Sequence, residues 1–213
     1  MSAYRTLLSP ASAEYTVNKS RFIGYAAPVS TEAEALAFLE SIRKKHRDAT
    51  HNCYAYTLGR NMGVMRYSDD GEPGGTAGLP MMEVIKKKAV CNCCAVVTRY
   101  FGGILLGAGG LVRAYSHACS IGLEAAKIVV MEESRPLLCE VAYPLWDRVQ
   151  HMLKAQPVRL ENVEFTSAVT FTLLVRLTDQ APVEDALIRL TDGRVEILPE
   201  DARYCAWETD EAT

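Results

Sequence analysis

The 213-residue sequence lacks the long apolar run that a membrane-spanning helix requires. Such a helix needs about 20 consecutive apolar residues, and every apolar stretch of this chain is shorter. Residues 1–18 also lack a basic segment followed by an apolar one, so we expect no signal peptide. These two absences predict a cytoplasmic protein that has no membrane partner.

The sequence also lacks the evenly paired cysteines of a secreted disulfide framework. Its seven cysteines are odd in number, and most of them lie within apolar runs. Secreted frameworks usually have an even number of cysteines at regular spacings. The pattern therefore indicates reduced, buried thiols in a cytoplasmic protein.

A strong charge of one sign is missing as well. The net charge is −3. Residues 1–133 carry 15 Lys and Arg against 12 Asp and Glu, whereas residues 134–213 carry 8 against 14. Neither part is strongly basic, so the charge balance alone does not indicate a nucleic-acid partner.

Residues 1–133 contain short apolar runs typical of strands and helical spacings of apolar residues. In chain order, these patterns predict a strand at 20–27, a helix from 31 to near the basic stretch 43–47, strands at 51–58 and 63–67, a helix at 77–87, a buried strand at 89–98 and a helix at 111–127. Glycine-rich loops precede the last two of these helices.

A domain boundary is predicted near residues 132–136. Beyond it, the patterns predict a strand at 137–143, a helix at 145–155, strands at 158–166 and 168–178, a helix at 182–190, a strand at 194–200 and a last short strand at 204–207. This βαββαβ order is that of a ferredoxin-like domain. The sequence thus predicts an α+β protein with one domain over residues 1–133 and a ferredoxin-like domain over residues 134–213.

Three carboxylates lie close together in the first glycine-rich loop, at Asp69, Asp70 and Glu72. Such carboxylates could bind a divalent cation or act as acid and base, although their spacing does not match a calcium-binding loop. The dipeptides Asp70-Gly71 and Glu72-Pro73 are also typical of a turn. The sequence leaves both interpretations open.

Glycines also cluster in residues 102–110, ahead of a predicted helix. Backbone N–H groups there could approach an anion at the positive helix end, and Arg99 and Arg113 could add charged contacts. Two nucleotide motifs are incomplete, because Ala108 replaces the lysine of a P-loop and Val112 the third glycine of a dinucleotide fingerprint. Tight turning is the alternative role, and no cofactor is predicted.

Basic residues at a predicted helix end are candidate phosphate contacts. Lys86, Lys87 and Lys88 form such a group. Basic residues are also common at helix C-termini for purely structural reasons. Together with Arg99 and Arg113, these lysines make up the predicted nucleic-acid surface.

The cysteines and histidines predict neither a metal site nor a thiol nucleophile. Cys91 and Cys94 have no second nearby pair of Cys or His that would complete four zinc ligands. His51 and Cys53 share one face of a predicted strand, but a thiol nucleophile also needs an orienting third group. We therefore predict core cysteines and no bound metal.

Five segments of the chain are motifs of one known family, namely 51–56, 66–73, 75–78, 98–103 and 106–115. Together they show that roughly residues 14–127 closely resemble the YigZ/IMPACT family. The resemblance implies an N-terminal domain similar to domain IV of elongation factor G. It also implies a C-terminal domain similar to the ferredoxin-like domain V of that factor.

The resemblance also implies a biological setting, since the eukaryotic relative acts in translational control. Two positions depart from the family pattern. Leu79 and Leu105 stand where many members carry a basic residue. Both departures remove positive charge beside the glycine-rich loops.

These features predict a non-catalytic protein that binds RNA or the ribosome and regulates translation. One alternative is an enzyme acting on a small anionic ligand through carboxylates and arginines. Another is a protein-interaction module that docks through the acidic residues 134–213. The candidate ligand-binding residues are His51, Asn52, Arg66, Asp69, Asp70, Glu72, Arg99, Tyr100, Gly102, Gly103, Gly109, Gly110 and Arg113.

Overall fold

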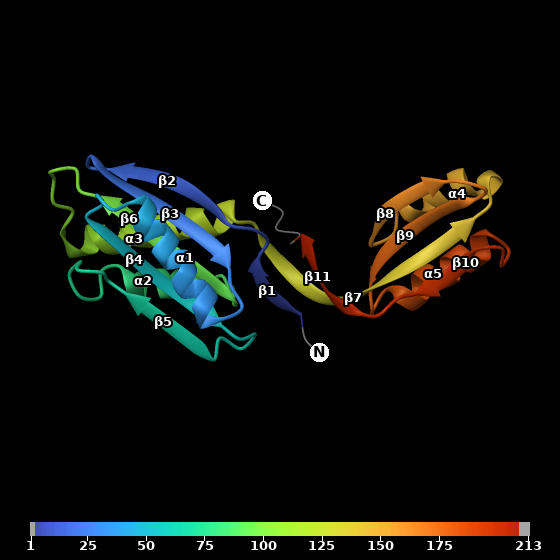
Figure 1. Ribbon diagram of the computed structural model, residues 1–213, viewed down its shortest axis with the longest axis horizontal. Helices are drawn as coiled ribbons and strands as arrows, with labels where there is room; N and C mark the ends of the chain where they lie inside the picture. Colours follow the sequence, from blue (N-terminus) through green and yellow to red (C-terminus); the bar gives the residue numbers. More distant parts are fainter. Residues whose placement is uncertain (1–2, 209–213) are drawn as a thin grey trace. The chain divides into compact units, whose positions relative to one another are not determined.

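The computed structural model describes residues 3–208 and divides the chain into two units (Figure 1). Of the described residues, 4–130 and 206–208 form the N-terminal unit, and residue 3 with 131–205 forms the C-terminal unit. Each unit contains both helices and strands, so the predicted α+β class is confirmed. No helix in residues 3–208 combines the length and the apolar character needed to cross a bilayer.

The N-terminal unit consists, in chain order, of β1 (Tyr4–Leu7), β2 (Ala11–Val17), β3 (Ser20–Pro28), α1 (Glu32–Lys45), β4 (His51–Leu58), β5 (Val64–Ser68), α2 (Gly78–Lys87), β6 (Cys93–Tyr100) and α3 (Gly107–Ala125). Five of its strands form an antiparallel sheet in the order β2-β3-β6-β4-β5. Strand β1 lies outside this sheet and pairs with β7 (Ile128–Val141).

Strand β6 is the centre of the sheet and is buried on both faces. Cys94 and Val96 pack in the core shared with α1, whereas Ala95 and Val97 pack in the core shared with α2 and α3. Successive strand residues point to opposite faces, so an apolar strand with helices on both sides has no polar face. Arg99 therefore belongs to the face that α2 and α3 cover.

Helix α3 packs against β3 so closely that the two backbones touch. The contact is made by Gly24 of β3, with Ala118 and Gly122 of α3. A Cβ atom on Gly24 would overlap the carbonyl oxygen of Ala118 and lie 2.8 Å from its carbonyl carbon. Glycine is required at this position because there is no room for a side chain.

Several predicted boundaries differ from the structure. The strand predicted at 89–98 begins only at Cys93, because Ala89 and Asn92 have left-handed backbones with φ of 53° and 52°. The helix predicted at 111–127 begins earlier, at Gly107. Strands β1 and β2 were not predicted from the sequence.

The C-terminal unit is formed by most of β7, followed by α4 (Tyr143–Leu153), β8 (Val158–Phe165), β9 (Val169–Arg176), α5 (Gln180–Leu190), β10 (Glu196–Pro199) and part of β11 (Arg203–Glu208). Its strands pair antiparallel in the order β10-β7-β9-β8, and β11 also pairs with β7. The predicted βαββαβ order is thus observed. The stretch 132–136 lies inside the continuous strand β7.

Candidate functional site

The acidic loop between β5 and α2, residues 69–77, folds back against the first residues of β4. Asp70 and Gly71 adopt left-handed backbones with φ of 44° and 86°, and the N–H of Glu72 donates to the carbonyl oxygen of Asp69 at 2.9 Å. The predicted turn chemistry is therefore present. It directs the three carboxylates of the loop to three different sets of partners.

Asp69 holds the start of helix α2. Its Oδ1 accepts hydrogen bonds from the backbone N–H groups of Ala77 (3.0 Å) and Gly78 (2.8 Å), and its Oδ2 accepts one from Gly75 (2.9 Å). Burial alone would raise the pKa of Asp69, but these three hydrogen bonds outweigh it and hold the pKa below its usual value. Asp69 thus takes the role of a capping residue from outside the helix.

We expect Asp69→Ala to lower the free energy of unfolding by about 2 kcal/mol, since three N–H groups lose their acceptor. The depressed pKa also predicts a pH dependence. The carboxylate stabilises the fold above its unfolded pKa, near 3.8, and this contribution is lost as the pH falls through the lower folded pKa. Urea unfolding of wild type and Asp69→Ala at neutral pH measures the first effect, and urea unfolding of wild type and Asp69→Asn between about pH 2 and pH 6 measures the second. If the free energy of unfolding of Asp69→Asn fell with pH as much as that of the wild type, the assignment of Asp69 as the cap of α2 would be contradicted.

Asp70 fastens the loop to β4 and to α1. Its Oδ2 accepts from the N–H of Asn52 at 2.7 Å, and its Oδ1 lies 3.2 Å from Nη2 of Arg43. The side-chain oxygen of Asn52 in turn accepts from the hydroxyl of Thr98 on β6, at 2.7 Å. The backbone N–H and side-chain oxygen of Asn52, and both oxygens of Asp70, are therefore engaged within the protein.

Glu72 lies at the centre of a buried polar cluster. Its Oε1 accepts from Nη1 of Arg99 at 2.6 Å and from the hydroxyl of Tyr115 at 2.8 Å, and lies 3.8 Å from Nε2 of His51. The side chains of Glu72 and Arg99 are only 3% and 7% exposed. The ion pair is therefore largely desolvated, so removal of either partner would leave the other charge buried without compensation.

Aromatic rings and a thiol surround this cluster. The guanidinium of Arg99 lies 5.4 Å from the ring centre of Phe22 and 5.5 Å from that of Phe101. Burial is the main cause that raises the pKa of the Cys53 thiol to about 12, and this thiol donates to the carbonyl oxygen of Asp69. Cys53 is therefore protonated at neutral pH and is unsuited to act as a nucleophile.

The structure separates several residues that the sequence grouped together. Tyr100 points to the opposite face of the sheet, where its hydroxyl lies 2.8 Å from Nδ1 of His46. Arg66 lies on the exposed strand β5. Gly102 donates its N–H to the hydroxyl of Ser20 and approaches the backbone of Lys19 too closely for any side chain.

The other candidate glycines lie next to α3. Gly103 precedes the helix and has a φ of 83°, whereas Gly109 and Gly110 lie in its first turn. Of the two arginines expected to hold a small anion, Arg99 is bonded to Glu72, and Arg113 lies outside the Glu72 cluster, on the groove described below. Within residues 3–208, no group of three or more His, Cys, Asp or Glu side chains is placed to hold a metal ion.

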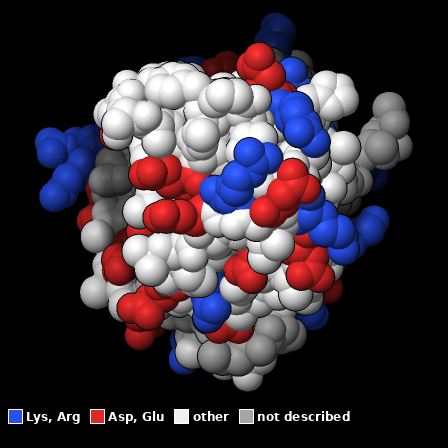
Figure 2. Space-filling view, turned by 90° about the vertical axis from the view of Figure 1, so that its right-hand side faces the viewer, with Lys and Arg blue, Asp and Glu red and all other residues white. Residues whose placement is uncertain are grey.

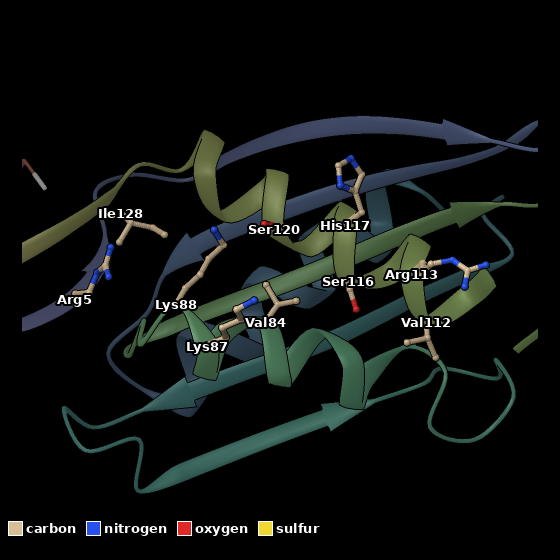
Figure 3. A pocket seen from close by; sticks show the side chains of 10 residues that line it. All are labelled: Arg5, Val84, Lys87, Lys88, Val112, Arg113, Ser116, His117, Ser120 and Ile128. Atoms are coloured by element: carbon tan, nitrogen blue, oxygen red, sulfur yellow. The ribbon is translucent and has the colours of Figure 1, made fainter. Parts of the chain in front are cut away.

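A groove between α2 and α3 is the second feature of this unit, here called the α2–α3 groove (Figure 3). It has a volume of about 560 Å³. Its basic lining residues are Arg5, Lys87, Lys88, Arg113 and His117, of which the four Arg and Lys side chains are cations. In the part of the chain that the structure describes, its lining includes no carboxylate.

The cations of this groove differ in their pairing. Lys88 pairs with Glu124 at 3.0 Å, beside the groove. Lys87 and Arg113 are exposed and form no ion pair with any residue in 3–208. Lys86, next to them in sequence, lies outside the groove and pairs with Glu83 at 2.8 Å.

Sequence and structure comparisons agree with this architecture. The Impact N-terminal domain model matches residues 18–123, and the model of a domain of unknown function matches residues 139–194. The IMPACT family member YvyE of Bacillus subtilis is 39% identical over 202 residues, which cover 95% of this chain and 93% of that protein. The chain belongs to the IMPACT family.

Two further comparisons extend over most of the chain. The IMPACT family member YigZ of Escherichia coli is 44% identical over 197 residues, with 89% of this chain and 94% of that protein covered. A crystal structure described only as that of a hypothetical protein is 30% identical, with a TM-score of 0.59, and covers 94% of this chain and 98% of its own. The family resemblance found in the motifs is thereby confirmed.

Sequence reasoning missed several members of the site, among them Tyr115 and Arg5. Tyr115 lies on the buried face of α3, at helical spacing from Leu111, and this spacing could have predicted its burial but not its contact with Glu72. Arg5 reaches the α2–α3 groove from β1, far away in sequence. No local pattern marks Arg5 as a member of the groove.

Proposed function

We propose that this protein is a non-catalytic RNA-binding protein that associates with structured RNA of the ribosome and takes part in translation regulation. The observation that carries the proposal is the α2–α3 groove, whose charged lining residues are all cationic. Phosphate contacts by Lys and Arg supply most of the affinity of proteins for nucleic acids. The implied similarity of the family to domains IV and V of elongation factor G adds support for a ribosomal partner.

The proposed RNA-binding surface differs from the nucleic-acid surface predicted from the sequence. Lys87, Lys88 and Arg113 remain in it. Arg99 is excluded, because its guanidinium is buried and bonded to Glu72. Lys86 is excluded as well, because it lies outside the groove and pairs with Glu83.

No second function is proposed for the acidic C-terminal unit. A docking face for a basic partner would need acidic side chains gathered in one area. Figure 2 views the molecule from the side of α4, α5 and β10, and shows basic side chains interspersed with the acidic ones on this face. This face therefore gives no specific support to the interaction-module hypothesis.

Co-sedimentation of the protein with ribosomes over a salt series tests the proposal. We expect binding to weaken steeply with salt, because bound phosphates release counterions. The double variant Lys87→Ala/Arg113→Ala should lose about 10-fold in affinity at about 100 mM salt and reduce the slope of log affinity against log salt by roughly 2. Both effects follow from the loss of two phosphate contacts.

A matched control removes two cations elsewhere on the same unit. Arg66→Ala/Lys44→Ala changes the net charge by the same amount, but both residues are exposed and lie outside the groove. This variant should keep its affinity within about 2-fold. Equal losses in the two double variants, or no binding by the wild type at low salt, would contradict the proposal.

A further inference from the structure

The α2–α3 groove continues into a second hollow, toward the N-terminal ends of both helices. This hollow has a volume of about 370 Å³. Val84, Lys87 and Val112 line both hollows, so they are parts of one continuous depression. The second hollow is lined by four apolar side chains, and its polar lining consists of Ser116, Lys87 and Glu83, whose carboxylate is paired with Lys86.

Two of these apolar side chains are open to solvent. Leu79 of α2 is 41% exposed and Val112 of α3 is 37% exposed, and Pro80 and Val84 complete the apolar lining. Exposed apolar surface within a concave site is a common mark of ligand binding. A ligand that fills the groove must therefore have an apolar part beside an anionic part.

We propose that the apolar end of the groove, at Leu79 and Val112, holds the base of an unpaired nucleotide. Lys87 and Arg113 hold the phosphates on either side of that base. This inference rests on the proposed function and specifies which form of RNA is bound. A nucleotide within a chain fits better than a free mononucleotide, because separate cations from two helices can contact phosphates that flank the base.

An RNA duplex cannot use the apolar end of the groove. Its bases are stacked inside the A-form helix, and it presents phosphates, 2′-hydroxyls and a shallow minor groove to a protein. Leu79 and Val112 would then face polar atoms. Unpaired loops and bulges, by contrast, expose bases that side chains can cover.

An acidic amphipathic helix fits the groove less well than a nucleotide does. Such a helix places apolar anchors on successive turns along its whole length. In this groove most of the apolar lining lies at the end formed by Leu79, Pro80, Val84 and Val112, and the remainder has Ile128 as its single apolar residue within 3–208, among basic ones such as Arg5 and Lys88. An RNA strand with one unpaired base matches this lining, because the base can cover the apolar end of the groove while the phosphates lie beside the basic residues.

Fluorescence anisotropy with a labelled 12-nucleotide single-stranded RNA, and with the same strand annealed to its complement, tests the inference. We expect the single strand to bind about 10-fold more tightly than the duplex, because only an unpaired base can cover the apolar surface of Leu79 and Val112. The variant Leu79→Ser/Val112→Ser should lose this preference and keep its affinity for the duplex. Because both side chains are exposed, circular dichroism should show an unchanged fold.

The outcomes separate this inference from the proposed function. Equal binding of both RNAs, unaffected by Leu79→Ser/Val112→Ser but reduced in Lys87→Ala/Arg113→Ala, would overturn the unpaired-nucleotide site and leave RNA binding in place. Binding of neither RNA at low salt would overturn both. Binding of an acidic amphipathic peptide, but of neither RNA, would also overturn both and would assign the groove to a protein partner.

Discussion

Glu72→Gln is expected to lower the free energy of unfolding by about 3 kcal/mol, although it changes only one oxygen to nitrogen. The substitution removes the negative charge beside Arg99, whose side chain is 7% exposed. The guanidinium then stays buried between Phe22 and Phe101 without a counter-charge. Urea unfolding measures the loss as a lower midpoint at an unchanged slope.

Glu83→Gln is the matched control for this experiment. Glu83 also forms an ion pair, with Lys86 at 2.8 Å, but both side chains are about half exposed. Exposed pairs of this kind contribute at most about 0.5 kcal/mol. A loss below 1 kcal/mol in Glu72→Gln would mean that water reaches Arg99, contrary to the burial found here.

A double substitution separates two contributions to stability, namely the penalty for a buried charge without a partner and the net contribution of the Glu72–Arg99 ion pair. Replacement of both partners by apolar residues, in Glu72→Met/Arg99→Met, removes both charges at once. Buried ion pairs replaced in this way often lose little stability, and the flanking aromatic rings can accept methionine side chains. We therefore expect the double variant to recover most of the stability that Glu72→Gln loses.

The same measurements bear on whether the Glu72 cluster serves folding or chemistry. Functional sites commonly hold groups at a cost in stability, so their removal often leaves the fold unchanged or more stable. Glu72, Asp69 and Asp70 are each bonded to partners from other elements. This arrangement assigns the geometry of the loop to the joining of β4, α2 and α3.

The sequence alone predicted much of the fold because its patterns are local. The alternating run at 51–58 and the order of elements after residue 137 follow from strand and helix periods, and the structure contains them. The predicted start of the first helix at residue 31 also agrees with the structure, since the Thr31 hydroxyl accepts from the N–H of Glu34 and caps the helix. Each of these features depends on residues only a few positions apart.

The features that sequence reasoning missed depend on distant residues. Arg99 and Tyr100 belong to one motif, yet the strand period places them on opposite faces, and only the packing of α2 and α3 decides which face carries the cluster. The groove combines Arg5 with residues of α2 and α3. No single segment of the chain therefore predicts that the groove is basic.

Gly24→Ala is expected to destabilise the N-terminal unit by at least about 3 kcal/mol. The added methyl group would overlap the carbonyl oxygen of Ala118, and Gly122 lies just behind it. These are backbone atoms of a helix, so a rotamer change cannot relieve the overlap. Either α3 must move away from β3, which loses packing around Phe22 and Tyr115, or the strand must distort.

The control for this prediction is a glycine where a methyl group has room. Gly74 lies in the acidic loop, and a Cβ built there has no neighbouring heavy atom within 4 Å. Gly74→Ala should therefore change the free energy of unfolding by no more than about 0.5 kcal/mol. Thermal unfolding of both variants gives the comparison, and failure of Gly24→Ala alone to fold would agree with the prediction. If the two variants unfolded at the same temperature, β3 and α3 could not be in the backbone contact that fixes the position of α3 beside the groove.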